Sequence, residues 1–202
     1  SIFNYAHLPT LFMPQRRISE DDLPSAAVKL EILQAAISFL AEQGYVYVGM
    51  DHFARPEDEL VVAQDKGLLH RNFQGYSTHA DCDMVAMGVT AISQVGNIYS
   101  QNTRDEESYY QMLDENRLPS MRGMTLTDDD LLRRTLISHL ICNFKLDMNQ
   151  FAQEHGIDFK SYFENEIDRL QEMQADGLLK FDGNELTVLP AGRLLIRNIC
   201  MI

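Results

Sequence analysis

The spacing of apolar residues changes near residue 104, and this change limits the folds open to the chain. Before it, helical spacing over residues 30–40 leads into a β-branched, apolar run at 45–50, which is typical of a helix followed by a buried strand. Beyond it, apolar residues recur at intervals of three and four, as on one face of a helix. We therefore predict an α/β part over residues 1–104 and a helical part over residues 105–202.

The α/β part contains units of an incomplete barrel. A second helix is predicted from Pro56 to Ala63, and a second strand over Met84–Val89. A helix that leads directly into a buried strand is typical of a parallel α/β layer. Two strand candidates are too few to close a barrel, so we expect only its terminal βα units.

The helical part begins at Thr127, a good N-cap that precedes three aspartates. One apolar stripe follows over residues 132–144, and a shorter helix is predicted over residues 148–155. Ser161 and Glu164 have the spacing of a capping box inside a third helix.

The sequence Asp182-Gly183-Asn184 lies between two apolar runs, residues 178–181 and 185–189, and predicts a β-hairpin. Three helices followed by such a wing describe a winged-helix-like domain, and domains with a recognition helix often bind DNA. However, residues 127–202 carry eight Lys or Arg against thirteen Asp or Glu. We predict no nucleic-acid partner, because a phosphate backbone requires a basic surface.

The composition of the whole chain indicates the cellular compartment of the protein. The net charge is −13, and the three cysteines, Cys82, Cys142 and Cys200, are dispersed rather than paired. Dispersed cysteines fit a reducing compartment. No apolar run is as long as a bilayer span, and the first residues lack the pattern of a signal peptide. We therefore expect a cytoplasmic protein without a membrane partner.

The polar stretch at residues 70–83 concentrates side chains that could do chemistry. His79, Asp81, Cys82 and Asp83 could be counted as metal ligands, but no second ligand set with matching spacing follows them. We therefore predict no metal here and favour Asp81 or Asp83 as a cap of the next element.

Two strand ends remain as candidates for a ligand site. Asp51-His52-Phe53 follows the strand that ends at Met50, and Gly88–Ser93 leaves the second predicted strand. Ligand sites in α/β layers are built at the carboxyl ends of strands. The loop His70–Tyr76 lies between these strands in the sequence, so we expect it at the rim of the same cleft.

Six ordered motifs resemble the oxygen-independent coproporphyrinogen III oxidases of bacterial haem synthesis. The resemblance runs from about residue 3 to residue 202 without a large gap. The motifs are Phe3–Pro9, Gly49–Ala54, His70–Tyr76, Gly88–Ser93, Tyr99–Asn102 and Gly192–Cys200.

This resemblance implies a radical S-adenosylmethionine enzyme. In that family a [4Fe–4S] cluster cleaves S-adenosylmethionine to a 5′-deoxyadenosyl radical, which removes hydrogen from the β-carbon of a substrate propionate. Carbon dioxide leaves and a vinyl group forms, and reaction at two propionates converts coproporphyrinogen III to protoporphyrinogen IX. The resemblance also implies part of an open radical-SAM barrel followed by a helical C-terminal domain, in agreement with the two spacings.

The chain departs from the family at the cluster. The family binds its cluster through a C-x-x-x-C-x-x-C motif, which this sequence lacks, and three dispersed cysteines cannot replace it. We therefore expect a C-terminal fragment that is inactive alone, with the cluster ligands on a missing N-terminal part. The full-length enzyme is expected to be a monomer, whereas the exposed strand edges of a cut barrel favour self-association of the fragment.

The resemblance also implies roles for individual residues. Two S-adenosylmethionine molecules are bound in the family, with Ala6 at the second and Ile92 at the first. A small Ala lets a ligand approach the backbone, and Ile offers an adenine ring an apolar wall; ordinary barrel packing is the alternative for both. The four carboxylates of the substrate require polar donors, and we propose that residues beside the strand ends supply them: Arg71, Arg55, His52 and Asn72. Pairing of Arg71 with a neighbouring acid is the alternative.

A rival interpretation is a non-catalytic haem-binding or interaction module related to the same family. His7, His52, His70 or His79 would then be an axial ligand, and haem titration would produce a Soret band. The order of the motifs favours the oxidase. A third interpretation, a DNA-binding regulator, is disfavoured by the acidic charge.

Overall fold

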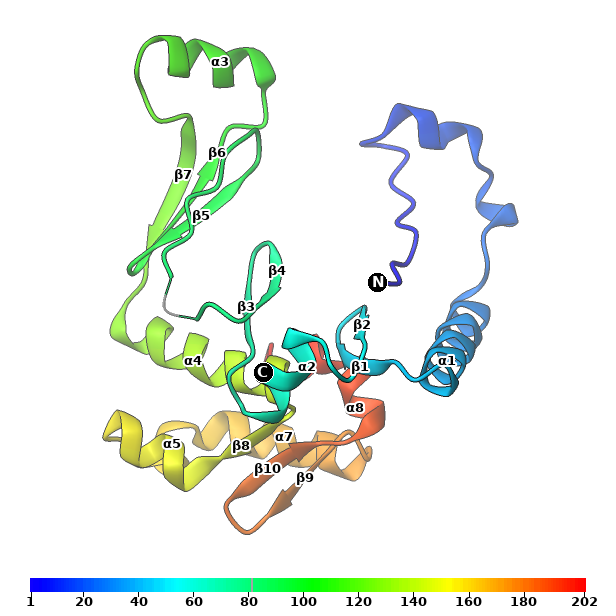
Figure 1. The fold of residues 1–202 in the computed structure, drawn as a ribbon, viewed down its shortest axis with the longest axis vertical. Helices are drawn as coiled ribbons and strands as arrows, with labels where there is room; N and C mark the ends of the chain where they lie inside the picture. Colours follow the sequence, from blue (N-terminus) through cyan, green and yellow to red (C-terminus); the bar gives the residue numbers. More distant parts are fainter. Residues whose placement is uncertain (81) are drawn as a thin grey trace.

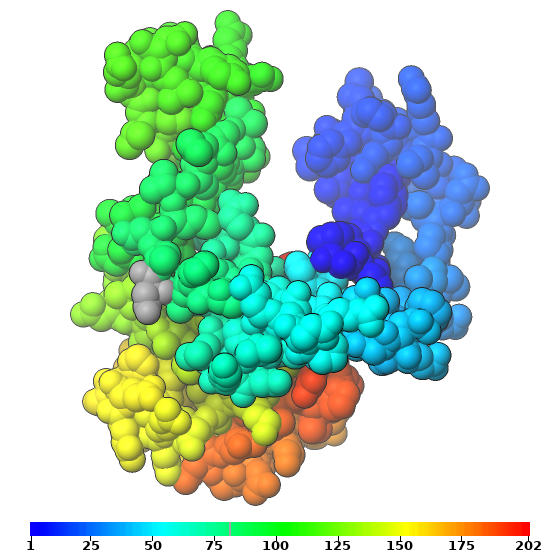
Figure 2. All heavy atoms as spheres, viewed as in Figure 1, coloured from blue at the N-terminus to red at the C-terminus, as the bar shows by residue number. Residues whose placement is uncertain are grey.

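The protein has two limbs that rise from a common base. The computed structural model describes residues 1–80 and 82–202. Figure 1 shows one limb formed by the N-terminal segment and helix α1 (Ala26–Glu42), and another formed by strands β5 to β7 with helix α3 (Glu106–Asp114). The C-terminal helices and a small sheet form the base. In the space-filling view the upper parts of the two limbs are separated by an open gap (Figure 2).

The N-terminal limb has almost no core of its own. It contains the 3-10 helices η1 (Met13–Arg17) and η2 (Glu20–Asp22), followed by α1, and none of the three elements has a buried residue. Ser25 caps α1 by accepting a hydrogen bond from the backbone N–H of Val28. The predicted helix over residues 30–40 is thereby confirmed.

The stretch Glu20–Glu42 contains an 18-residue window with a mean hydropathy of 1.4, and it passes a length and composition test for membrane-spanning helices. Such a test is weak evidence, because helices of soluble proteins also pass it. The α-helical portion begins only at Ala26 and would be about 26 Å long at 1.5 Å per residue, short of the roughly 30 Å hydrocarbon core. It also carries Lys29 and Glu31.

A small antiparallel sheet connects the N-terminal limb to the base. Strands β1 (Val46–Gly49) and β2 (His52–Ala54) pair in register Val46 to Ala54, and helix α2 (Glu59–Asp65) packs against β1. The first predicted strand is confirmed, but the predicted parallel layer is wrong for this sheet. Met50, with φ of 57°, lies in the tight turn between the two strands. After β1 the chain therefore reverses direction and pairs antiparallel as β2, whereas a parallel pair would need a longer crossover connection, usually a helix.

This region has a second, smaller core and is tied to the base. Its buried residues are Val48, Ala54, Val61, Ala63, Leu69 and Cys142. Cys142 belongs to helix α4 (Asp128–Asn143) of the base. The Gln64 amide donates to the Val48 carbonyl at 2.7 Å and to the Cys142 carbonyl at 2.6 Å, so one side chain connects β1 with α4.

Residues 70–77 form a hairpin rather than the loop predicted for His70–Tyr76. Strands β3 (His70–Asn72) and β4 (Gly75–Ser77) pair antiparallel, and Asn72 Oδ1 accepts a 2.8 Å hydrogen bond from the backbone N–H of Gln74 in the turn. The hairpin was not predicted, because its strands consist mainly of polar residues and strands are recognised in a sequence by alternating apolar residues.

The second limb is a three-stranded antiparallel sheet in the order β5-β6-β7. The strands are β5 (Ile92–Val95), β6 (Ile98–Asn102) and β7 (Ser120–Thr125), and α3 lies between β6 and β7 in the chain. Strand β6 lies before residue 104 and strand β7 lies after it, so one sheet contains strands from both sides of the position where the spacing of apolar residues changes.

The strand predicted over Met84–Val89 is wrong. Only Met84 forms a bridge there, with Gln94 of β5. Val85 and Met87 are 74% and 88% exposed, and Gly88 adopts a φ of 106° that interrupts an extended run. An apolar sequence without a partner strand therefore remained irregular. The element that carries Ile92 is the strand after it, β5.

The three helices predicted in the base correspond to four helices in the structure, because the third is divided in two. They are α4, α5 (Met148–His155), α6 (Phe159–Tyr162) and α7 (Glu164–Ala175). Thr127 caps α4, as predicted, and the structure adds a capping box with Asp130. The capping box of Ser161 with Glu164 is wrong. Asp158 instead accepts a hydrogen bond from the Ser161 N–H, and the chain breaks between α6 and α7 at Phe163.

The predicted hairpin is confirmed and belongs to a three-stranded sheet. Strands β9 (Leu179–Asp182) and β10 (Glu185–Val188) pair antiparallel, and β8 (Lys145–Asp147) joins the other edge of β10. Two short helices, α8 (Pro190–Leu194) and α9 (Ile196–Ile199), follow the sheet. The sheet covers the main core, whose buried residues are Leu140, Phe144, Leu146, Met148, Phe151, Phe159, Phe163, Leu170, Leu179, Leu186, Val188, Ile196 and Ile199.

Candidate functional site

A cavity of about 490 Å³ lies where the N-terminal segment, the two hairpins and α9 meet; we call it the junction cavity. Segments distant in the sequence contribute to it, so it forms only when the whole chain folds. Its lining residues are Ile2, Phe3, Asn4, Leu33, Met50, Asp51, His52, Arg71, Phe73, Gln74, Gly75, Leu194, Ile196, Arg197 and Asn198.

The turn after β1 places Asp51 and His52 in this cavity. The hydroxyl of Tyr47 donates to the Met50 carbonyl at 2.8 Å, which supports the left-handed backbone of Met50. His52 Nδ1 then lies 2.9 Å from Asp51 Oδ1, and the His52 ring meets the Tyr76 ring edge-on at 5.3 Å. Burial raises the pKa of Tyr47 to about 12, so its hydroxyl remains a donor at neutral pH.

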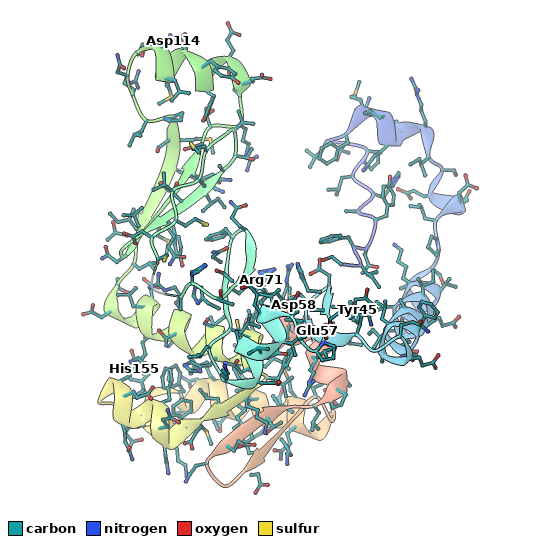
Figure 3. All side chains as sticks on the ribbon, viewed as in Figure 1. Tyr45, Glu57, Asp58, Arg71, Asp114 and His155 are labelled. Carbon is teal, nitrogen blue, oxygen red and sulfur yellow. The ribbon has the colours of Figure 1, made fainter. Side chains whose placement is uncertain are left out.

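The β3–β4 hairpin contributes Arg71, which Figure 3 shows beside the hairpin near the centre of the molecule. Arg71 and Tyr76 are paired across the two strands, with the guanidinium carbon 5.3 Å from the ring centre. Arg71 Nε and the Tyr76 hydroxyl are both buried and without a hydrogen-bond partner among the described residues. Burial also raises the pKa of Tyr76, which keeps it neutral.

Gly49 allows this arrangement of Tyr76. Its φ is 144°, and a Cβ at this position would overlap the Tyr76 hydroxyl. Only glycine accommodates both the backbone angle and the approach of the ring. The local sequence therefore brings together a guanidinium, an imidazole and a phenol whose polar atoms are not fully used by the protein. Buried polar groups of this kind cost free energy unless a ligand or water pairs with them.

A second cavity, of about 330 Å³, lies on the β5-β6-β7 sheet. Ile92 lines it together with Tyr99, Gln101, Arg122 and Met124. Phe73, at the tip of the β3–β4 hairpin, lines both cavities and meets the Tyr99 ring edge-on at 5.2 Å. The hairpin tip is thus the shared wall of the two cavities.

The structure brings some predicted site residues together and leaves others apart. Arg71 and His52 share the junction cavity, and Ile92 lines the adjacent one. Ala6 is exposed and is not among the lining residues, although Asn4, two residues before it, is.

Arg55 and Asn72 are engaged elsewhere. Arg55 donates to the Gln43 carbonyl at 3.0 Å and stacks 4.3 Å above the Tyr45 ring, which Figure 3 places on the side of α1. Asn72 holds the hairpin turn through its bond from Gln74. Both side chains have local structural roles that do not depend on a ligand.

The described residues do not fit an iron–sulfur cluster. No group of three His, Cys, Asp or Glu side chains in residues 1–80 and 82–202 is arranged to hold a metal ion. Cys142 is fully buried, Cys200 is half-buried, and Cys82 is exposed. Asp83 accepts a 2.7 Å hydrogen bond from the Gly96 N–H in the turn between β5 and β6, whereas Asp81 lies outside the described residues.

Comparison with known proteins shows what this chain is similar to. Residues 126–195 match the HemN C-terminal domain family. The chain is 53% identical over its whole length to the oxygen-independent coproporphyrinogen III oxidase of Salmonella typhimurium, and it covers 44% of that protein. The chain is similar to the C-terminal part of such oxidases. The predicted resemblance is therefore confirmed.

Further relatives of the oxidase family agree. The enzyme of the same name from Thermostichus vulcanus is 45% identical over 203 residues, and the chain covers 62% of it. A solved structure, coproporphyrinogen III oxidase (HemN) from Escherichia coli, described as a radical SAM enzyme, superposes with a TM-score of 0.95 at 52% identity. All of this chain and 46% of that one are covered. The chain thus spans less than half the length of most of the oxidases that it matches.

Some lining residues were not anticipated from the sequence. Arg197 and Asn198 lie in the motif Gly192–Cys200 but had no assigned role, because an arginine between two isoleucines resembles an ordinary surface position. Tyr76 closes the His70–Tyr76 motif, and only its pairing opposite Arg71 shows what it contacts.

Proposed function

We propose that this chain is the C-terminal part of an oxygen-independent coproporphyrinogen III oxidase. The full-length enzyme would oxidatively decarboxylate two propionates of coproporphyrinogen III to vinyl groups, giving protoporphyrinogen IX through 5′-deoxyadenosyl radical chemistry. The observation that carries this proposal is the match along the entire chain, in sequence and in structure, to enzymes of that name.

The proposal requires S-adenosylmethionine and a [4Fe–4S] cluster, which together supply the radical. Because the described residues do not fit a cluster, its ligands would come from outside this chain. Ile92 would contact one S-adenosylmethionine, since its cavity offers an apolar and aromatic wall, and Ala6 would contact the second.

Within the junction cavity we assign the substrate contacts to Arg71 and His52 rather than to Arg55 and Asn72. Arg71 has an unpartnered buried Nε, and a guanidinium can pair with both oxygens of a carboxylate. His52 Nδ1 lies 2.9 Å from Asp51 Oδ1, and the residue lines the cavity. These side chains would bind and orient propionates and exclude water from the reacting carbon.

The finer architecture also belongs to the proposal. Residues 1–104 would contribute the last units of a radical-SAM barrel, and residues 105–202 would form a winged-helix-like domain. The order of α4, α5 and α7 followed by the β9–β10 wing supports the latter. Acidic charge on this domain argues for a role in packing and not in DNA binding.

Isolated residues 1–202 would be catalytically inactive and prone to self-association, whereas the full-length enzyme would be a cytoplasmic monomer. The large apolar side chains exposed on α1 support self-association; they are Val28, Leu30, Ile32 and Phe39. Analytical ultracentrifugation of the isolated chain should show dimers or larger species that the full-length enzyme does not form.

The test of the proposed function uses the full-length enzyme, purified without oxygen with its cluster in place. It is supplied with coproporphyrinogen III, S-adenosylmethionine, an electron donor that reduces the cluster, and an electron acceptor that takes the electron released with each carbon dioxide. The wild type should form protoporphyrinogen IX. Arg71→Ala should raise KM about tenfold to a hundredfold, because one charge-assisted contact is worth roughly 1.5–3 kcal/mol. The matched control Arg55→Ala should stay within about twofold. A wild-type enzyme that forms no vinyl product would overturn the proposed function, and equal KM values for both variants would overturn the assignment of Arg71.

A further inference from the structure

We propose that Arg197, on helix α9, is a carboxylate-binding residue that acts together with Arg71 across the junction cavity. This inference rests on the proposed function and adds a ligand contact from the C-terminal end of the chain. Residue 197 lies just beyond the segment 126–195 that matches the HemN C-terminal domain family.

The packing of α9 directs Arg197 toward the cavity. Ile196 and Ile199, three residues apart, are 1% and 2% exposed and belong to the main core. Residues three apart lie on the same face of a helix. Arg197 and Asn198 lie between them, and both line the junction cavity. The backbone of α9 is therefore fixed by the core, while the guanidinium remains exposed at the cavity wall.

The charges around the junction cavity favour an anionic ligand. The chain carries a net charge of −13, yet the lining contains two arginines and a single carboxylate, Asp51. Asp51 already lies 2.9 Å from His52 Nδ1. Among residues 1–80 and 82–202, Arg71 and Arg197 form no ion pair and no hydrogen bond through their guanidinium groups.

Several arginines elsewhere in the chain are engaged by protein atoms. Arg133 binds Asp129 and Glu166, Arg117 binds Glu115, and Arg169 donates to the Ile202 carbonyl. Within the described part of the chain, Arg71 and Arg197 have no such partner, and both line one cavity. Like charges at one cavity repel each other, and a carboxylate between them would relieve that repulsion.

The other polar lining residues complete a site suited to a carboxylate. The side-chain amides of Asn4, Gln74 and Asn198 supply neutral hydrogen-bond donors to the same cavity. Two ligands of the proposed enzyme carry carboxylates: the porphyrinogen propionates and the methionyl end of S-adenosylmethionine. The shared chemistry is the carboxylate, and the experiment below distinguishes the two sources.

The experiment measures equilibrium binding to the full-length enzyme and its Arg197→Ala and Arg197→Lys variants without oxygen. The probes are coproporphyrin III, its tetramethyl ester, S-adenosylmethionine, and 5′-methylthioadenosine, which lacks the methionyl carboxylate. Arg117→Ala, on the exposed end of the second limb, is the control. Thermal melting should change little in any variant, because Arg197 and Arg117 are both exposed.

If Arg197 binds the porphyrin, Arg197→Ala should weaken coproporphyrin III binding about tenfold to a hundredfold and leave the ester unaffected. If Arg197 binds the cofactor, the variant should bind S-adenosylmethionine more weakly by a similar factor, and its affinity for 5′-methylthioadenosine should be unchanged. Arg197→Lys should recover part of the loss in either case. Affinities within twofold of wild type for both carboxylate probes would overturn the inference while leaving the proposed function intact. A wild-type enzyme that binds neither probe would overturn both.

Discussion

The C-terminal base and the N-terminal limb both contain helices with apolar residues, but the two regions pack very differently. In the base, the apolar faces of α4, α5 and α7 close on the β8-β10-β9 sheet and form a continuous core. In the limb, α1 has a more apolar sequence than α4, α5 or α7, yet it has no buried residue. An apolar helical pattern therefore specifies the element but not whether the rest of the chain will cover it. The junction cavity lies between these two regions, and one of its walls is formed by α9, which packs into the core of the base through Ile196.

The largest effect should come from removing a core side chain of the base. Phe151 is 2% exposed and packs edge-on against Phe159 at 5.9 Å. Phe151→Ala should lower the free energy of unfolding by about 3–5 kcal/mol, because a large cavity remains. The same change at Phe39 of α1, which is 60% exposed, should cost about 0.5 kcal/mol or less. Urea denaturation followed by circular dichroism measures both, and equal losses would contradict the contrast between the two regions.

A smaller, pH-dependent effect should come from the ion pair that joins α4 to α7. Arg133 Nη1 lies 2.6 Å from Glu166 Oε1, and this hydrogen bond lowers the pKa of Glu166 below its ordinary value of 4.5. The contribution to stability is therefore present above about pH 4.5 and is lost as the pH falls through the folded-state pKa. Because both side chains are partly exposed, the contribution should be about 0.5–1 kcal/mol.

Glu166→Gln should remove this contribution at pH 7 and bring the variant close to wild type at pH 3. Glu31→Gln on α1 is the matched control, since Glu31 forms no ion pair with any described residue. Denaturation curves at the two pH values provide the comparison. A stability difference between Glu166→Gln and wild type that is the same at both pH values would show that the ion pair is not its source.

The smallest perturbation uses the cysteines as reporters of packing. Burial raises the pKa of Cys142 to about 11 and that of Cys200 to about 12, whereas Cys82 is exposed. Only a thiolate reacts readily with iodoacetamide. At pH 8 the folded protein should therefore be modified at Cys82 first, and at the other two only after unfolding. Mass spectrometry of the modified peptides checks this, and equally fast labelling of Cys142 would mean that the contact between α2 and α4 opens freely.

Local signals in the sequence predicted the base well. Thr127 with Asp130, and Asp182-Gly183-Asn184 between two apolar runs, specify a helix start and a hairpin through contacts within a few residues. Strand β8 could not be predicted in this way, because its three residues become a strand only by pairing with β10, about forty residues later. The strand predicted over Met84–Val89 did not form, because its pairing with β5 is limited to the single bridge between Met84 and Gln94.

The site was predicted in part, although for an incomplete reason. Asp51 and His52 were chosen as the end of a parallel strand, whereas an antiparallel turn places them in the cavity. Arg71 was chosen in a supposed loop and lies on a hairpin strand. Arg197 was beyond prediction, because its importance depends on α9 meeting hairpins that lie more than a hundred residues earlier in the chain.

A crystal structure of the full-length enzyme with S-adenosylmethionine and coproporphyrin III would test the central claim most directly. The account predicts ligand density in the junction cavity, with a carboxylate against Arg71 and Arg197, and S-adenosylmethionine in contact with Ile92 and Ala6. Density for both ligands elsewhere, with the junction cavity filled by side chains of the remaining polypeptide, would contradict it.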